Sequence, residues 1–446
     1  MTIHNNFALF SAAILASTLF FAACSDDSSS APEEKSSHEE ETSHEEHHGH
    51  HMEEPSEGDL TLGDEDIQDG FIFLQDTTIN GVLTVSTTTP GATVLKNVKV
   101  TGNLLIKRSG RVDFSGSADV VHVGSSNTDV YAFEDEAQVN GHHFMGKNNT
   151  FTTKSFAEYQ NVDWTEKSVD LATGIHLAYT VTGDEKGTPV VLIHGLTDGR
   201  VSWSQVAPSL AKKGYRVYVP EYRGNGKTDK PIDESSYSVA ELASDIAAFV
   251  EKLGLKKVHI VGHSLGAFIA QELSITNAEI VSSITLIGSG ASVDKKNATL
   301  DWLVNGTDDE SFDGIYAYDS TQKLPESFIQ AWGYSTNPDK DFQAANLEHL
   351  KQVPYYVWKY LVKNLLKIDN TKRLSSIATD VQIIWGTKDA LFDSESQKTL
   401  QKGLSGAKSV VFHEVEGADH NTHWGSAEDV KTVTGYIDEF IKSLKK

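Results

Sequence analysis

The hydrophobic pattern divides the chain into stretches of different character, and the longest alternates short apolar runs with amphipathic ones. Between residues 156 and 446 the apolar runs are short and rich in β-branched residues, as buried parallel strands are. They lie at 190–193, 217–219, 258–261, 283–287 and 381–385. Amphipathic stretches such as 239–253 and 394–404 lie between them. The alternation predicts an α/β domain over 156–446, with a mostly parallel sheet and helices on both faces.

One segment of this domain, about 291–375, interrupts the alternation. It holds 12 of the aromatic residues of the chain, whose Phe, Trp and Tyr contents are 19, 7 and 14. We expect it to form a helical cap. Its aromatic side chains are expected to line a pocket for an apolar or aromatic substrate group, with some forming the core of the cap.

Residues 61–155 have a different pattern. Short β-branched runs such as 78–85 and 98–106 alternate with Gly, Asn and Thr turns, and segments of helical period are missing. This predicts an all-β accessory module. The repeated pattern indicates stacked β-solenoid coils, but its glycines show no steady period, so a small sandwich stays open. The module could bind a glycan or another surface ligand, or act as a spacer.

The first 60 residues are predicted to be a signal and a tether. Residues 7–23 are an apolar run, shorter than the ~20 residues that span a bilayer, so 1–23 is expected to be a secretion signal. Residues 24–60 are almost devoid of apolar side chains and are predicted to be disordered. Within them, 38–54 hold six His and seven Glu, which could bind metal or form a hydrophilic spacer.

The single cysteine of the chain, Cys24, follows the apolar run directly. Small residues before a lone cysteine resemble the lipobox of bacterial lipoproteins. The resemblance implies that Cys24 becomes a lipidated N-terminus, so that the protein is exported and anchored to a membrane. Ser25 after it is compatible with the outer membrane. An uncleaved anchor and an ordinary signal peptide remain alternatives.

The charge of the chain changes this picture little. The net charge is −25, but residues 1–70 contain 17 acidic residues and one Lys, so most of it belongs to the predicted tether. A basic patch of the kind that binds nucleic acid is absent from the sequence.

The pentapeptide Gly262–Gly266 reads G-x-S-x-G and carries candidate chemistry. It follows the apolar run 258–261 and precedes the helix-like run 267–273. Strand, tight turn and helix are the context of a nucleophile elbow. Side chains at either glycine would clash with neighbouring backbone, and the turn would hold the Ser264 hydroxyl at the end of the strand.

Further motifs follow the same chain order, and together they resemble the α/β-hydrolase superfamily over about 160–446. They are His194–Thr197, Arg223–Thr228, Ile383–Asp389 and Glu416–His420. The resemblance implies a catalytic triad of Ser264, Asp389 and His420, in the chain order of that superfamily. It also implies an oxyanion hole made by the backbone N–H groups of Leu196 and Leu265.

Other residues compete for these roles. Asp393 and Asp419 are rivals for the acid, and His423 is a rival for the base. Epoxide hydrolases and haloalkane dehalogenases of the superfamily carry Asp where this chain has Ser264, so they are set aside. No glycine-rich dinucleotide or phosphate loop is found, and we expect no cofactor.

The sequence therefore predicts an exported, membrane-tethered serine hydrolase that cleaves a small carboxylic ester through an acyl-enzyme. Lactonase, C–C bond hydrolase, perhydrolase and aminopeptidase activities could use the same triad. A hypothesis of another class is a surface-binding lipoprotein with a vestigial hydrolase domain.

Overall fold

The computed structural model assigns most of the chain to two regular architectures within one unit, residues 47–446. It describes residues 50–51, 58–68, 70–132, 137–152, 165–307, 312–318, 324–334 and 339–445. The expected signal peptide, Cys24 and most of the expected tether lie outside the described residues. His50–His51 form a short strand within the range expected to be disordered, since backbone pairing requires no apolar side chain.

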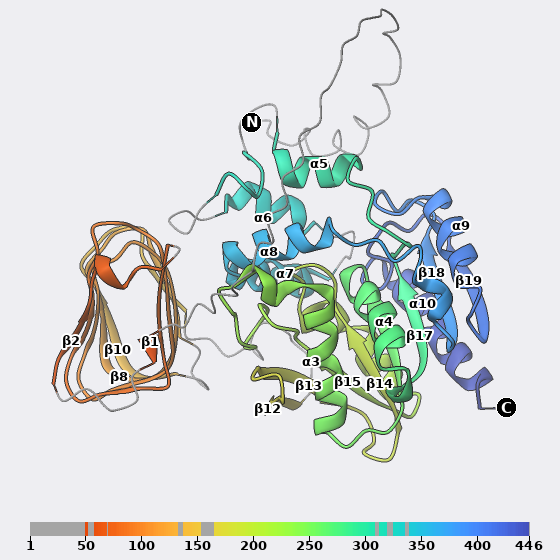
Figure 1. The fold of residues 1–446 in the computed structure, drawn as a ribbon, viewed down its shortest axis with the longest axis horizontal. Coiled ribbons are helices and arrows are strands. Elements are labelled where there is room, and N and C mark those ends of the chain that lie inside the picture. Colours follow the sequence, from red (N-terminus) through yellow and green to blue (C-terminus); the bar gives the residue numbers. More distant parts are fainter. Residues whose placement is uncertain are drawn as a thin grey trace, which may run out of the picture. The chain divides into compact units, whose positions relative to one another are not determined.

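The N-terminal module is built of strands that pair in parallel (Figure 1). They are β1 (His50–His51), β2 (Leu60–Leu62), β3 (Phe71–Gln75), β4 (Thr78–Ile79), β5 (Leu83–Val85), β6 (Ala92–Val100), β7 (Leu104–Ile106), β8 (Gly110–Val123), β9 (Thr128–Tyr131), β10 (Ala137–Phe144) and β11 (Thr150–Thr152). Every pairing between these named strands is parallel. The module is thus a solenoid of stacked coils, because a sandwich would pair its strands antiparallel.

Polar side chains of the solenoid stack from one coil to the next. Asn97 bonds to Asp76, Asn140 to Asp119 and Asn148 to Asn127, each across a separation of 21 residues. The interior is an apolar core that includes Leu74, Leu95 and other buried aliphatic residues. Coils of unequal length explain why the glycines of the sequence show no steady period, since other pairings join residues 17 to 19 apart.

The second architecture is an eight-stranded sheet in the order β12-β13-β15-β14-β16-β17-β18-β19. Its strands are β12 (Thr165–Asp170), β13 (His176–Thr182), β14 (Thr188–Ile193), β15 (Tyr215–Pro220), β16 (Val258–His263), β17 (Val281–Ile287), β18 (Asp380–Gly386) and β19 (Ser409–Val415). The pairings of β13 with β12 and β15 are antiparallel, and the remaining ones are parallel. The predicted mostly parallel sheet is confirmed.

Helices cover both faces of this sheet (Figure 1). They are α2 (Val206–Ala211), α3 (Val239–Lys252), α4 (Leu265–Thr276), α9 (Ser394–Gly403) and α10 (Ala427–Ser443). Along β14, Val190 and Leu192 join the core that includes α2 and α10, whereas Val191 and Ile193 join the core that includes α3 and α4. Successive side chains of a strand point to opposite faces, so the continuous apolar run reflects burial on both sides.

A helical cap separates β17 from β18, as expected. Its helices are α5 (Ala298–Asn305), α6 (Glu326–Trp332), α7 (Lys340–Gln352) and α8 (Tyr355–Leu365), and Figure 1 shows them grouped together. Five cap aromatics contact one another, with ring centroids 4.3 to 6.4 Å apart: Trp302, Phe312, Phe328, Trp332 and Trp358. These side chains therefore form the core of the cap. In the described part of the chain, no helix has the length and apolar character needed to span a membrane.

Candidate functional site

The G-x-S-x-G motif lies at the junction of β16 and α4. Ser264 stands between the last residue of the strand and the first residue of the helix, with φ of 50° and ψ of −116°. A residue with a β-carbon adopts this backbone conformation only when its surroundings impose it. A Cβ at Gly262 would overlap the carbonyl of Gly266, and a Cβ at Gly266 would overlap the carbonyl of Ile193. Both glycines are thus required by the close approach of strand, turn and helix.

The candidate oxyanion donors belong to two segments, the start of α4 and the loop after β14. Leu265 opens α4, and the first N–H groups of a helix have no partner within it and carry the positive end of its dipole. Leu196 lies in the loop after β14, next to Thr197, whose φ is +56°. The Tyr222 hydroxyl donates to the Gly195 carbonyl at 2.5 Å, and this bond fixes the loop.

Asp389 and His420 come together at the carboxyl ends of β18 and β19. The distance from His420 Nδ1 to Asp389 Oδ2 is 3.0 Å. The other carboxylate oxygen, Oδ1, accepts from the N–H groups of Leu391 and Phe392 at 2.8 and 3.0 Å. A carboxylate held in this way can orient the imidazole and stabilise its cation.

The ionisation of the pair follows from its burial and its mutual attraction. Burial raises the pKa of Asp389, but the charge of His420 and the hydrogen bonds to the carboxylate outweigh it and hold the pKa below its usual value. Burial alone would lower the pKa of His420, but the charge and hydrogen bond of Asp389 outweigh burial and raise it. The imidazole is therefore more basic than an ordinary histidine.

The end of β17 connects the serine to the histidine. The Ser264 N–H donates to the carbonyl of Ile287 at 2.9 Å. A Cβ on the next residue, Gly288, would lie 3.1 Å from the His420 ring. The backbone of the nucleophile turn therefore contacts Ile287, and the ring of the candidate base lies close to the next residue, Gly288. The Ser264 side chain is buried, with 8% of its surface exposed.

The rival residues have other contacts. Asp393 is the N-cap of α9 and accepts from the N–H and the hydroxyl of Ser396, each at 2.9 Å. Asp419 accepts from the N–H of Asn421 at 2.8 Å. His423 is fully buried between aromatic rings, with the Trp203 ring centroid 4.3 Å away, and burial places its pKa well below the usual value. Asp389 is the carboxylate that contacts His420 Nδ1.

Three supporting residues were not identified as site residues from the sequence. Besides Tyr222, they are Asp198, in the loop after β14, and His263, directly before the nucleophile. His263 lies within the Gly262–Gly266 motif, and its place beside the nucleophile indicates a structural packing or hydrogen-bonding role. Nothing in a single sequence distinguishes Asp198 or Tyr222 from other polar residues near strand ends.

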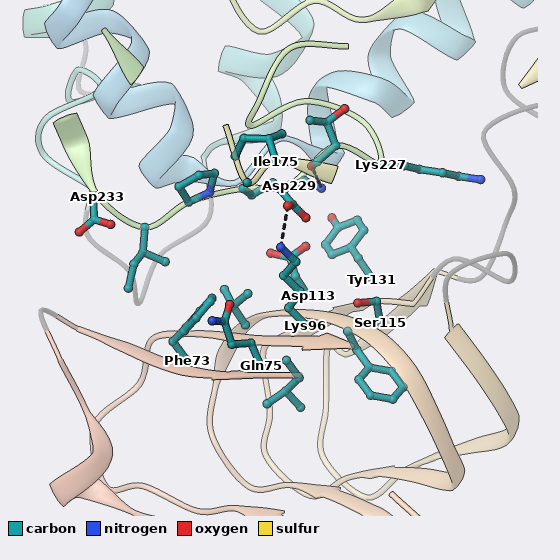
Figure 2. Close-up of a pocket in the computed structure, with 18 residues that line it drawn as sticks. Phe73, Gln75, Lys96, Asp113, Ser115, Tyr131, Ile175, Lys227, Asp229 and Asp233 are labelled. Atoms are coloured by element: carbon teal, nitrogen blue, oxygen red, sulfur yellow. Dashed lines mark hydrogen bonds and ion pairs between the residues drawn. The ribbon is translucent and has the colours of Figure 1, made fainter. Parts of the chain in front are cut away.

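A pocket elsewhere in the unit is lined by residues of β3, β6, β8 and β9 and of the segment 227–233 (Figure 2). The dashed line in Figure 2 is an ion pair between Lys96 and Asp229, with Nζ and Oδ2 2.6 Å apart. Its lining includes none of the candidate triad residues. Within the described ranges, no group of three His, Cys, Asp or Glu residues is arranged to hold a metal ion.

Comparisons with known proteins identify the family of the second architecture. A family model described as the alpha/beta hydrolase fold matches residues 188–427. The chain is similar to epoxide hydrolase 1 of Caenorhabditis elegans, with 25% identity over 68% of this chain and 77% of the relative. It is also similar to 2-hydroxy-6-oxononadienedioate/2-hydroxy-6-oxononatrienedioate hydrolase 1 of Pseudomonas putida, with 28% identity over 61% of this chain and 93% of the relative.

A solved structure shares the fold as well. A hydrolase from Pseudomonas aeruginosa PA01 superimposes with a TM-score of 0.51 and 18% identity, covering 62% of this chain and 98% of that structure. The relatives are named as hydrolases. The matched residues contain six of the eight strands of the sheet, β14 to β19, together with the elbow and the cap. The chain therefore belongs to the α/β-hydrolase fold family.

Proposed function

We propose that the protein hydrolyses a carboxylic ester through an acyl-enzyme, with Ser264 as nucleophile, His420 as base and Asp389 as the orienting acid. The observation that carries the proposal is the strained backbone of Ser264 at the β16–α4 junction, together with the bond between partly buried His420 and buried Asp389. The end of β17 links the two, since Ile287 bonds to Ser264 and Gly288 adjoins the His420 ring. A serine hydroxyl needs such a base to act as a nucleophile near neutral pH.

The proposed reaction has two halves. His420 Nε2 takes the proton of the Ser264 hydroxyl as Oγ bonds to the ester carbonyl carbon, and the oxyanion is held by the N–H groups of Leu196 and Leu265. The carbon–oxygen bond to the alcohol then breaks, and His420 gives its proton to the departing alcohol. Water repeats the sequence on the acyl-enzyme, which releases the acid and restores Ser264.

The two relatives suggest different chemistry, and Ser264 discriminates between them. Epoxide hydrolases of the superfamily use Asp as nucleophile, and a serine at this position argues against epoxide opening. The Pseudomonas putida relative is named for the hydrolysis of a hydroxy-oxo-dienedioate. Cleavage of a C–C bond with the same triad is therefore the second candidate.

Active-site labelling tests the proposal. We expect a fluorophosphonate probe to form one covalent adduct, on the peptide that contains Ser264, because only an activated serine attacks phosphorus rapidly. We also expect p-nitrophenyl butyrate to give a burst of p-nitrophenol when deacylation is slower than acylation. Turnover of a 2-hydroxy-6-oxo-dienoate without ester turnover would favour C–C cleavage instead. Lack of labelling at Ser264 would contradict both.

The proposed location is the membrane surface, with the enzyme attached through lipid on Cys24. The support is the residue pattern of 7–24, an apolar run that ends in small residues and a lone cysteine. In this proposal the substrate lies outside the cytoplasm.

We expect the Cys24→Ser variant, produced in a Gram-negative host, to lose incorporation of an alkyne-tagged fatty acid and to leave the membrane fraction. A thioether at the cysteine is the attachment point, and serine cannot form it. Fractionation and click labelling of the two proteins would measure this, with Ser29→Ala as the matched control in the same segment. Equal labelling of wild type and the Cys24→Ser variant would overturn lipid attachment at this residue.

A further inference from the structure

A second carboxylate–imidazole pair lies beside the candidate triad. Asp198 follows Leu196 by two residues in the oxyanion loop, and His263 is the last residue of β16, directly before Ser264. Asp198 is 5% exposed and His263 is 2% exposed. Asp198 Oδ2 lies 3.6 Å from His263 Nδ1. Neither side chain has a part in the reaction described above.

The other ring nitrogen of His263 reaches the candidate base. His263 Nε2 lies 3.1 Å from the backbone carbonyl oxygen of His420. A carbonyl oxygen can only accept a hydrogen bond, so Nε2 carries the proton. Burial lowers the pKa of His263, and the negative charge of Asp198 counters part of that effect. The ring thus connects the nucleophile strand to the loop of the base.

Close packing surrounds this connection. The ring centroids of His263 and His420 are 4.9 Å apart. On the end of β17, a Cβ at Gly288 would lie 2.9 Å from the same His420 carbonyl. A Cβ at Gly195 would lie 2.7 Å from Asp198 and 2.8 Å from His263, so the oxyanion loop rests directly on the pair. Strand, oxyanion loop and base loop all meet at these two side chains.

We propose that Asp198 and His263 are positioning residues, which hold the His420 loop and the oxyanion loop in register with Ser264. The inference rests on the proposed function of the triad. Neither residue touches the reacting atoms in it. Misplacement of a catalytic group by about 1 Å can cost about 10²-fold in rate, so a bond that fixes the backbone of His420 has a measurable effect.

Asp198 also contributes to the electrostatics of the base. The charged and titratable groups that face His420 are Asp389 after β18, Asp198 after β14, His263 on β16, and Asp419 and His423 on its own loop. The negative charge of Asp198 is one of those that raise the pKa of His420. A base must be neutral, so the activity rises with pH through this pKa. Removing the charge of Asp198 should lower the pKa of His420 and so move the acid limb of the pH–rate profile to lower pH.

The test compares His263→Gln with His263→Leu, and Asp198→Asn with wild type. Gln can donate to the His420 carbonyl, whereas Leu has similar size and no donor. We expect His263→Leu to lower kcat for p-nitrophenyl butyrate by about 10- to 10²-fold with little change in KM, and His263→Gln to recover most of kcat. We expect Asp198→Asn to shift the acid limb of the kcat/KM profile to lower pH, an effect that a merely structural role would not produce.

An exposed pair of the same kind supplies the control. Asp170 Oδ1 lies 2.7 Å from His176 Nδ1, and the variants Asp170→Asn and His176→Gln should leave both kcat and the pH profile unchanged. Equal kcat for the Leu and Gln variants, or an unshifted profile in Asp198→Asn, would overturn the proposal. If His263→Leu does not fold, as judged by circular dichroism, the Asp198→Asn profile decides alone. Labelling of the wild-type protein separates failure of this inference from failure of the proposed function. If the fluorophosphonate probe does not label the wild type, the triad is refuted and the inference falls with it.

Discussion

Replacement of Ser264 by Ala is expected to abolish ester hydrolysis, with kcat falling by about 10³- to 10⁶-fold. Without the hydroxyl no acyl-enzyme can form, and the activity that remains comes from binding and oxyanion stabilisation by the Leu196 and Leu265 N–H groups. Initial rates with p-nitrophenyl acetate and butyrate measure the loss. Fluorophosphonate labelling should disappear in parallel. The fold should persist, because Ala removes a single oxygen atom and keeps the Cβ that the turn already accommodates.

The matched control is Ser405→Ala, at an exposed serine, which should keep wild-type rates and labelling. If Ser264→Ala retained most of the activity, the nucleophile would have to be another group. If the wild-type protein itself neither hydrolysed esters nor reacted with the probe, a surface-binding lipoprotein with a vestigial hydrolase domain would be the better description.

Replacement of Asp389 by Asn is expected to lower kcat/KM by about 10³- to 10⁴-fold. The amide is isosteric, but its NH₂ group favours the wrong imidazole tautomer, in which His420 Nε2 already carries a proton. The charge and hydrogen bond of Asp389 also counter the burial that would lower the pKa of His420. The residual activity should therefore have its acid limb at lower pH than that of wild type. A pH–rate profile of both proteins measures the two effects.

Asp393→Asn is the matched control for this variant. Asp393 caps α9, and asparagine is an equally good N-cap residue, so both stability and rate should stay near those of wild type. A large loss with Asp393→Asn and a small one with Asp389→Asn would exchange the roles of the two carboxylates.

Much of the fold could be predicted from the sequence because its signals are local. The apolar run 190–193 indicated a strand buried on both faces, and the structure places its alternate side chains in two separate cores. The interruption at 291–375 indicated a cap, and that region forms helices. The packing of the cap aromatics, by contrast, could not be predicted. The sequence showed that they are abundant but not which surfaces they contact, and the structure shows that Trp302, Phe328 and Trp358 pack in the core of the cap.

The architecture of the accessory module could not be predicted from local sequence signals alone. β-Branched runs separated by glycine and asparagine are compatible with a sandwich and with a solenoid. The choice depends on whether successive runs pair in parallel or antiparallel, and that is a property of residues from different coils. The stacking of Asn97 on Asp76 and Asn148 on Asn127 belongs to the parallel arrangement.

The sequence by itself determined the elbow of this protein. Gly262 and Gly266 flank Ser264 within one tight turn, and the residues that the turn requires are five consecutive positions of the sequence. The tertiary structure alone decided which side chains meet around it. His420 contacts Asp389 across 31 positions of the chain, and His263 reaches the His420 carbonyl across 157. Such contacts depend on the order of strands in the sheet and on the packing of loops at its edge, because no local pattern encodes the distance between residues so far apart.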